Sequence, residues 1–207
     1  MKTREIILSA AALIALCGPS AFAQQSSTGS TTTTDTDKPA SIAQRKDNQQ
    51  DRIAQGIDSG QLTAGETKNL ETKEAGVNKE EHTMRSEDDG HLTAADRTKL
   101  NNQQNHLSNR IYDDKHNANT AHYGNGEIGQ RRENQQDRIA QGVKSGQLTA
   151  GETSRLENRE QGINREVSAD KQANGGKLTG ADRRAINQSQ NRASRSIYRD
   201  KHNGARR

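Results

Sequence analysis

One segment of the chain occurs twice. Residues 42–117 recur as residues 128–203, displaced by 86 positions without a gap, and 43 of the 76 aligned positions are identical. A sequence repeated this closely is expected to fold as two copies of one unit. We therefore predict two tandem copies, joined by a linker at residues 118–127 and followed by a basic tail at residues 204–207.

The chain begins with the features of an export signal. Lys2 and Arg4 precede an apolar run over residues 6–16, which is short for a membrane span, and residues 21–23 (Ala-Phe-Ala) fit a signal-peptidase site. We predict cleavage after residue 23 and a periplasmic or secreted protein without a transmembrane segment. The single cysteine, Cys17, leaves lipid anchoring open as an alternative.

The chain beyond residue 23 is poor in apolar residues. It holds 20 Leu, Ile and Val among 184 residues, no cysteine, and three aromatic residues, Tyr112, Tyr123 and Tyr198. So little apolar surface predicts a thin core, and the lack of cysteine excludes disulfides and thiol chemistry in the mature protein. Residues 24–41 are rich in Ser and Thr and predict a flexible, disordered N-terminal tether.

Apolar residues recur at helical spacing in three stripes of each copy. Three helices are expected in the first copy, near residues 42–58, 63–87 and 93–116, and three in the second. No segment alternates apolar and polar residues as a half-buried strand does, so we predict an all-α fold. The stripes of the first copy are Ile42, Gln49, Ile53 and Ile57; Leu70, Val77 and Met84; and Leu100, Leu107 and Ile111.

A short string marks the ends of these helices. The pattern Gly-x-Leu-Thr-x-x-acid occupies residues 60–66, 90–96, 146–152 and 176–182. A threonine followed three residues later by an acid forms a capping box, in which each side chain bonds a backbone amide at the helix start. The preceding glycine favours the end of the helix before it. The string therefore predicts a tight turn between two helices, four times.

The same string resembles the second half of an EF-hand calcium loop, in which a glycine makes the bend and the last acid binds the ion. The resemblance implies calcium ligands, and only residues 90–96 have further acids nearby. The candidate metal ligands are therefore Glu87, Asp89 and Asp96, although Arg85 takes the place of the first ligand. Capping explains the string without a metal, and we predict no metal site and no cofactor, with calcium binding as an alternative.

Motifs that carry catalysis are missing from the sequence. Residues 124–129 (Gly-Asn-Gly-Glu-Ile-Gly) match the spacing of a dinucleotide-binding loop, but no predicted strand precedes them. His116 and His202 stand at equivalent positions, where a histidine at the C-terminal end of a helix is the ordinary interpretation. We predict that the protein is not an enzyme and has no catalytic residues.

Charge is divided unevenly between the copies. Residues 42–129 hold 11 Lys or Arg and 15 Asp or Glu, a net charge of −4, whereas residues 130–207 hold 17 and 9, a net charge of +8. This asymmetry predicts a polyanion or protein partner for the second copy, or pairing with an acidic first copy. A solvated arginine-rich face without a partner is the alternative. The arginines of the last segment are Arg183, Arg184, Arg192, Arg195, Arg199, Arg206 and Arg207.

The composition also resembles that of hydrophilins and of helical late-embryogenesis-abundant-type stress proteins, with a mean hydropathy of −1.20 and many glycines. The resemblance implies protection of membranes or proteins under water stress. Glycines within the predicted helices either weaken them or let neighbouring helices approach. The sequence thus favours a non-catalytic structural or partner-binding protein, with a stress protectant and a calcium-binding protein as alternatives. These glycines are Gly56, Gly76, Gly142 and Gly162.

Overall fold

The computed structural model describes residues 41–206, and this part of the chain is all-helical, as predicted. The predicted signal peptide (residues 1–23) and the predicted tether up to residue 40 lie outside the described residues. Within residues 41–206 there is no strand, and none of the helices has the length and apolar character needed to cross a membrane. The helices are α1 (Ile42–Asp58), α2 (Ala64–Glu87), α3 (Ala94–His116), α4 (Glu127–Lys144), α5 (Ala150–Ala173) and α6 (Gly180–Lys201).

The predicted helix boundaries of the first copy are confirmed to within one residue. At the start of the second copy, α4 begins at Glu127, inside the segment predicted to be the linker. Glu127 places an acid in the first turn of α4, where it complements the helix dipole. The connection between α3 and α4 is therefore slightly shorter than the sequence indicated.

All four predicted capping boxes are present. At the start of α2, the Thr63 hydroxyl accepts a bond from the amide of Glu66 (3.3 Å), and a Glu66 carboxylate oxygen accepts one from the amide of Thr63 (2.9 Å). The glycines that open the four strings have φ between +68° and +87°, a region that costs side-chain-bearing residues energy. Local sequence therefore sets both ends of each turn. The other boxes pair Thr93 with Asp96, Thr149 with Glu152 and Thr179 with Asp182.

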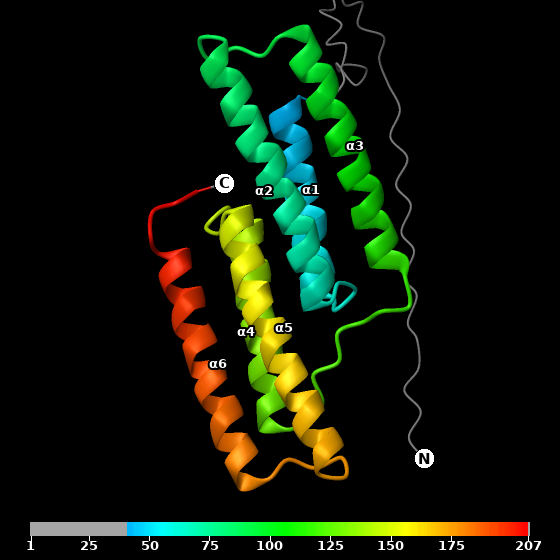
Figure 1. The fold of residues 1–207 in the computed structure, drawn as a ribbon, viewed down its shortest axis with the longest axis vertical. Helices are drawn as coiled ribbons and strands as arrows, with labels where there is room; N and C mark the ends of the chain where they lie inside the picture. Colours follow the sequence, from blue (N-terminus) through cyan, green and yellow to red (C-terminus); the bar gives the residue numbers. More distant parts are fainter. Residues whose placement is uncertain (1–40, 207) are drawn as a thin grey trace, which may run out of the picture. The chain divides into compact units, whose positions relative to one another are not determined.

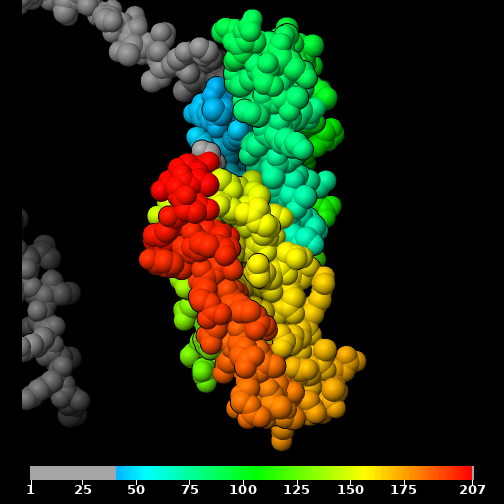
Figure 2. Space-filling model, turned by 60° about the vertical axis from the view of Figure 1, so that its left-hand side comes forward, coloured from blue at the N-terminus to red at the C-terminus, as the bar shows by residue number. Residues whose placement is uncertain are grey.

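The most extensive helix contacts join the two sequence copies: α2 packs on α5, and α1 packs on α4. Figure 1 shows α1–α3 grouped in one half of this six-helix body and α4–α6 in the other. In Figure 2, α5 (yellow) lies between α2 and α6, in agreement with the contacts between these helices. Helices α1 and α2 thus each pack on their own sequence duplicate. This is the arrangement of a two-fold symmetric contact built within one chain.

The hydroxyl contact of Thr72 with Ser154, at 2.7 Å, joins the N-terminal halves of α2 and α5. The Ser154 hydroxyl also donates to the carbonyl oxygen of Lys68 (3.3 Å). A Cβ added at Gly65, which precedes Lys68 on α2, would lie 2.5 Å from the side chain of Gln161, which follows Ser154 on α5. The two helices therefore run in opposite directions, with their N-terminal halves in contact. Each helix then extends away from the contact through its C-terminal half.

The largest group of buried apolar residues, which we call the central cluster, lies where the two copies meet. All six helices contribute to it, so the two copies share one core. Two smaller clusters lie beyond it, one formed by Val77, Met84, Leu92 and Leu100 and the other by Ile163, Val167, Ile186 and Ala193. The central cluster consists of Ile53, Ala54, Ile57, Leu62, Leu70, Leu107, Ile111, Ile139, Ala140, Val143, Leu148, Leu156 and Ile197.

The helical glycines fall into two classes that the sequence did not separate. A Cβ added at Gly56 would lie 2.6 Å from two side-chain atoms of Leu62, which is fully buried. A Cβ added at Gly76 would meet nothing within 4 Å. The second copy repeats this difference: a Cβ added at Gly142 would lie 2.6 Å from Leu148, whereas one added at Gly162 would meet nothing within 4 Å.

We expect Gly76→Ala to raise the free energy of unfolding by about 1 kcal/mol, because alanine restricts the unfolded chain and favours a helix. Gly56→Ala should lower it, because the methyl group overlaps Leu62 and the packed core cannot yield without cost. Urea unfolding followed by circular dichroism measures both changes. Gly162→Ala and Gly142→Ala are the matched pair in the second copy, and equal stabilisation by all four substitutions would contradict this account.

Candidate functional site

The candidate calcium ligands do not form a site. Glu87 is the last residue of α2, Asp89 lies in the following turn with φ +49°, and Asp96 is in the first turn of α3. One Asp96 oxygen accepts bonds from the amide (2.9 Å) and the hydroxyl (2.6 Å) of Thr93. Nowhere in residues 41–206 do three or more His, Cys, Asp or Glu side chains gather to hold a metal ion.

The two equivalent histidines pack against tyrosines one turn earlier. The ring of His116 stacks on Tyr112 with centroids 4.1 Å apart, and His202 stacks on Tyr198 at 4.2 Å. In each pair, Nδ1 of the histidine is within 2.7 Å of the tyrosine carbonyl oxygen. This capping of the last turn gives both histidines a structural role, and the stacking on tyrosine adds a contact that the sequence did not indicate.

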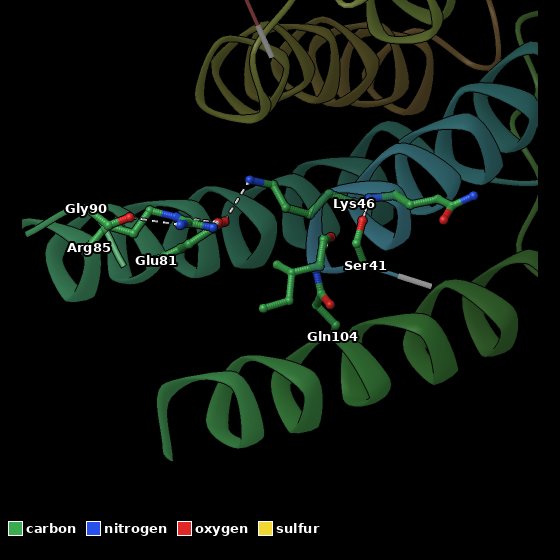
Figure 3. Close-up of polar contacts among 8 residues, drawn as sticks. Ser41, Lys46, Glu81, Arg85, Gly90 and Gln104 are labelled. Carbon is green, nitrogen blue, oxygen red and sulfur yellow. Dashed lines mark hydrogen bonds and ion pairs between the residues drawn. The ribbon is translucent and has the colours of Figure 1, made fainter. Parts of the chain in front are cut away.

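At the end of the first copy that lies away from the central cluster, one carboxylate pairs with two cations. The two carboxylate oxygens of Glu81 on α2 form ion pairs with Nζ of Lys46 on α1 (3.0 Å) and with Nη2 of Arg85 (2.9 Å) (Figure 3). The Arg85 guanidinium also donates a hydrogen bond to the carbonyl oxygen of Gly90 (3.2 Å). Burial raises the pKa of Glu81, but the bonds from Lys46 and Arg85 outweigh it and hold this pKa below its ordinary value. Glu81 therefore stays ionised and offsets two cations.

The second copy lacks this carboxylate. Val167 stands at the position of Glu81, while Arg132 and Lys171 replace Lys46 and Arg85 and keep their positive charges. Arg132 turns to the linker, where its guanidinium lies 5.2 Å from the ring centre of Tyr123 and 3.5 Å from the carbonyl oxygens of His122 and Tyr123. Burial lowers the pKa of Arg132. Within residues 41–206, Arg132 and Lys171 therefore form none of the direct ion pairs that Lys46 and Arg85 form with Glu81. The carboxylate whose charge acts on Arg132 is that of Glu160.

A surface cavity of about 430 Å³, which we call the cationic cavity, opens at this end of the second copy. Three exposed cations line it: Lys171 from the end of α5, Lys177 from the α5–α6 turn and Arg183 from the first turns of α6. Across residues 41–206, no carboxylate forms an ion pair with any of these three side chains. Glu127 is the one acid in the lining, so positive charge dominates the cavity.

The remaining wall of the cavity is the start of α4 and the glycine-rich segment before it, residues 124–129. Gly126 caps α4 without a side-chain hydrogen bond, whereas Ser41 caps α1 with its hydroxyl. Gly124 has φ +78°, and a Cβ added at Gly129 would lie 2.0 Å from the Gly124 carbonyl oxygen. The glycines therefore let the linker cross close to the first turn of α4. A glycine-rich loop leading into a helix start presents backbone amides to anions.

The arrangement gathers positive charge around one open cavity. Cationic side chains and the positive end of the α4 dipole converge on one open cavity. The sequence pointed to Arg183 and to the glycine-rich segment, which was set aside because no predicted strand precedes it, but it did not point to Lys171 or Lys177. The sequence contains the replacement of Glu81 by Val167, but it lies in a segment where the two copies share no residue, so the sequence alone does not single it out. Comparison of the chain with protein-family models, curated proteins and solved structures gave no match.

We expect Asp96→Ala to lower the midpoint of thermal unfolding by the same amount in excess calcium and in chelator, because its carboxylate caps α3. Asp182→Ala removes the equivalent cap of α6 and is the matched control. Differential scanning calorimetry in both buffers measures the effect. A calcium-induced rise of the midpoint in the unmodified chain that Asp96→Ala abolishes would restore the calcium hypothesis.

Proposed function

We propose that this protein is a non-catalytic helical binding protein and that the cationic cavity of its second copy binds polyanions carrying phosphate or sulfate groups. The observation that carries the proposal is Val167 in place of Glu81, beside a cavity lined by three unneutralised cations. Cationic side chains and helix-start amides bind such groups with charge-assisted hydrogen bonds.

The distribution of ion pairs supports this assignment to the second copy. Four of the five ion pairs within residues 41–206 belong to the first copy, and the fifth joins the neighbours Arg199 and Asp200. The second copy also has the larger positive charge. An excess of unpaired positive charge on one part of a protein steers anionic polymers toward that part.

In this proposal the two copies are three-helix repeats with different roles. The first repeat completes the central cluster and pairs the cations at its outer end with Glu81, while the second holds the binding site. The leader-like character of residues 1–23 supports a periplasmic or secreted protein in this proposal, for which anionic glycans and lipids would be the accessible polyanions.

The test is salt-dependent binding of the full chain to linear polyphosphate and, in parallel, to dextran sulfate. We expect affinity for at least one polymer to fall with salt, and Lys171→Gln/Arg183→Gln to reduce the slope of log K against log salt by about 2. The matched control, Arg85→Gln/Arg97→Gln, removes the same two charges from the equivalent positions of the first copy. It should leave most of the affinity in place.

Val167→Glu gives an independent test, because it adds the missing carboxylate without removing a cation. Glu81 shows that this position accommodates a largely buried glutamate. The substitution should weaken polyanion binding while the helical content stays unchanged. Equal losses from the two double variants, or no effect of Val167→Glu, would contradict a site at the cationic cavity.

A further inference from the structure

Four glutamates are buried on helices α2 and α5, and one from each helix, Glu71 and Glu157, lie close enough for the charge of one to act on the other. Glu71 and Glu157 are fully buried, and Glu74 and Glu160 are exposed by only 1% and 2%. They occupy equivalent positions of the two copies, so the near-symmetric contact brings like residues to both of its sides. We call these four residues the glutamate cluster. Carboxylates are rarely buried in this way unless they are paired or protonated.

Neutral amides hold the two innermost members. One oxygen of Glu71 accepts a bond from the Gln50 side chain on α1 at 3.1 Å, and one oxygen of Glu157 accepts the equivalent bond from Gln136 on α4 at 3.0 Å. The second oxygen of Glu157 has no hydrogen-bond partner in residues 41–206. A glutamine side chain can bond a protonated carboxyl group as well as an ionised one.

The charges around Glu157 and Glu160 come from three elements. Glu71 faces Glu157 from α2, Arg132 and Arg138 act on Glu160 from α4, and Tyr123 of the linker lies near both glutamates. Helix α6 packs on α4 and α5, and the residues that it adds to the apolar clusters are Ile186, Ala193 and Ile197.

Burial, which disfavours the charged form, is the main reason that the pKa of Glu157 lies well above its ordinary value. Repulsion from Glu160 and Glu71 acts in the same direction, against the bond from Gln136. Burial also raises the pKa of Glu160 to about 7, although Arg132 and Arg138 oppose the shift. Both groups therefore keep their protons to a higher pH in the folded protein than in the unfolded chain.

We propose that the glutamate cluster makes the packing of α2 on α5 depend on proton uptake, so that the two copies are held together most firmly on the acid side of neutrality. Each step is the addition of one proton to one carboxylate, which removes a negative charge from the contact. Near and above neutrality the same contact holds like charges, and the two copies separate more readily. This inference does not depend on the polyanion site.

The sign of the pH dependence follows from these shifts. A carboxyl group whose folded-state pKa exceeds its unfolded value binds more protons in the folded chain, so stability falls as pH rises between the two values. For Glu160 this interval runs from its ordinary value to about 7. The capping carboxylates of Glu66 and Glu152 have lowered pKa values and act in the opposite direction, at lower pH.

The experiment is thermal unfolding of the full chain from pH 5 to pH 8, with and without Glu71→Gln/Glu157→Gln. We expect the midpoint of the unmodified chain to fall across this range and that of the variant to fall less steeply, because glutamine resembles the neutral acid at position 157 while Glu160 still titrates. The control Glu80→Gln/Glu166→Gln removes two carboxylates from further along the same two helices. It should keep the pH dependence of the unmodified chain.

Proton release on unfolding in urea at pH 6, measured at constant pH, tests the proposal even if the variant folds poorly. The unmodified chain should release about two protons, and the Glu71→Gln/Glu157→Gln variant about one fewer. A chain that releases no protons, or a midpoint independent of pH, would overturn the proposal. So would a glutamate variant with the same pH dependence as its control.

Discussion

The structure depends on the packing of α1 and α2 against their own duplicates, α4 and α5. The chain has 20 Leu, Ile and Val beyond residue 23, and 17 of them are buried. The other three, Ile42, Ile128 and Leu178, pack against the two smaller clusters. Every Leu, Ile and Val beyond residue 23 is therefore already packed in a cluster. One copy alone has too little apolar surface to offset the entropy of ordering three helices. The shared central cluster removes this limit because each copy completes the core of the other.

Sparse apolar content also explains why polar side chains occupy core positions. The Gln49 side chain donates a hydrogen bond to the backbone carbonyl oxygen of Gln104 (2.7 Å). The Gln104 side chain in turn donates one to the backbone carbonyl oxygen of Ile42 (3.0 Å). Gln135 and Gln190 repeat this arrangement in the second copy. These bonds tie α1 to α3 and α4 to α6 where other helical proteins use aliphatic contacts. They satisfy the donors of the buried amides, which limits the cost of burying them.

The features that the sequence predicted well are local ones. The apolar stripes and the capping strings located α2 and α3 because helix periodicity and capping depend on residues a few positions apart. Gly56 and Gly76 looked alike for the same reason: only tertiary packing sets Leu62 against one of them. The meaning of Val167 was equally out of reach, because it requires knowing that Lys46 and Arg85 converge on Glu81. Glu71 and Glu157 resembled ordinary surface acids until helix pairing placed them at a contact.

The packing of each copy against its duplicate also explains where the sequences of the two copies differ. Residues 48–56 and 59–67 are identical to their counterparts, and they include much of the contact between copies. Residues 81–89 share no residue with 167–175, and these segments lie at the ends beyond the central cluster. In a two-fold contact each substitution alters one side of a matched surface, so the centre tolerates little divergence. The outer ends contact only their own copy. One end was therefore free to become cationic without disturbing the core that both copies need.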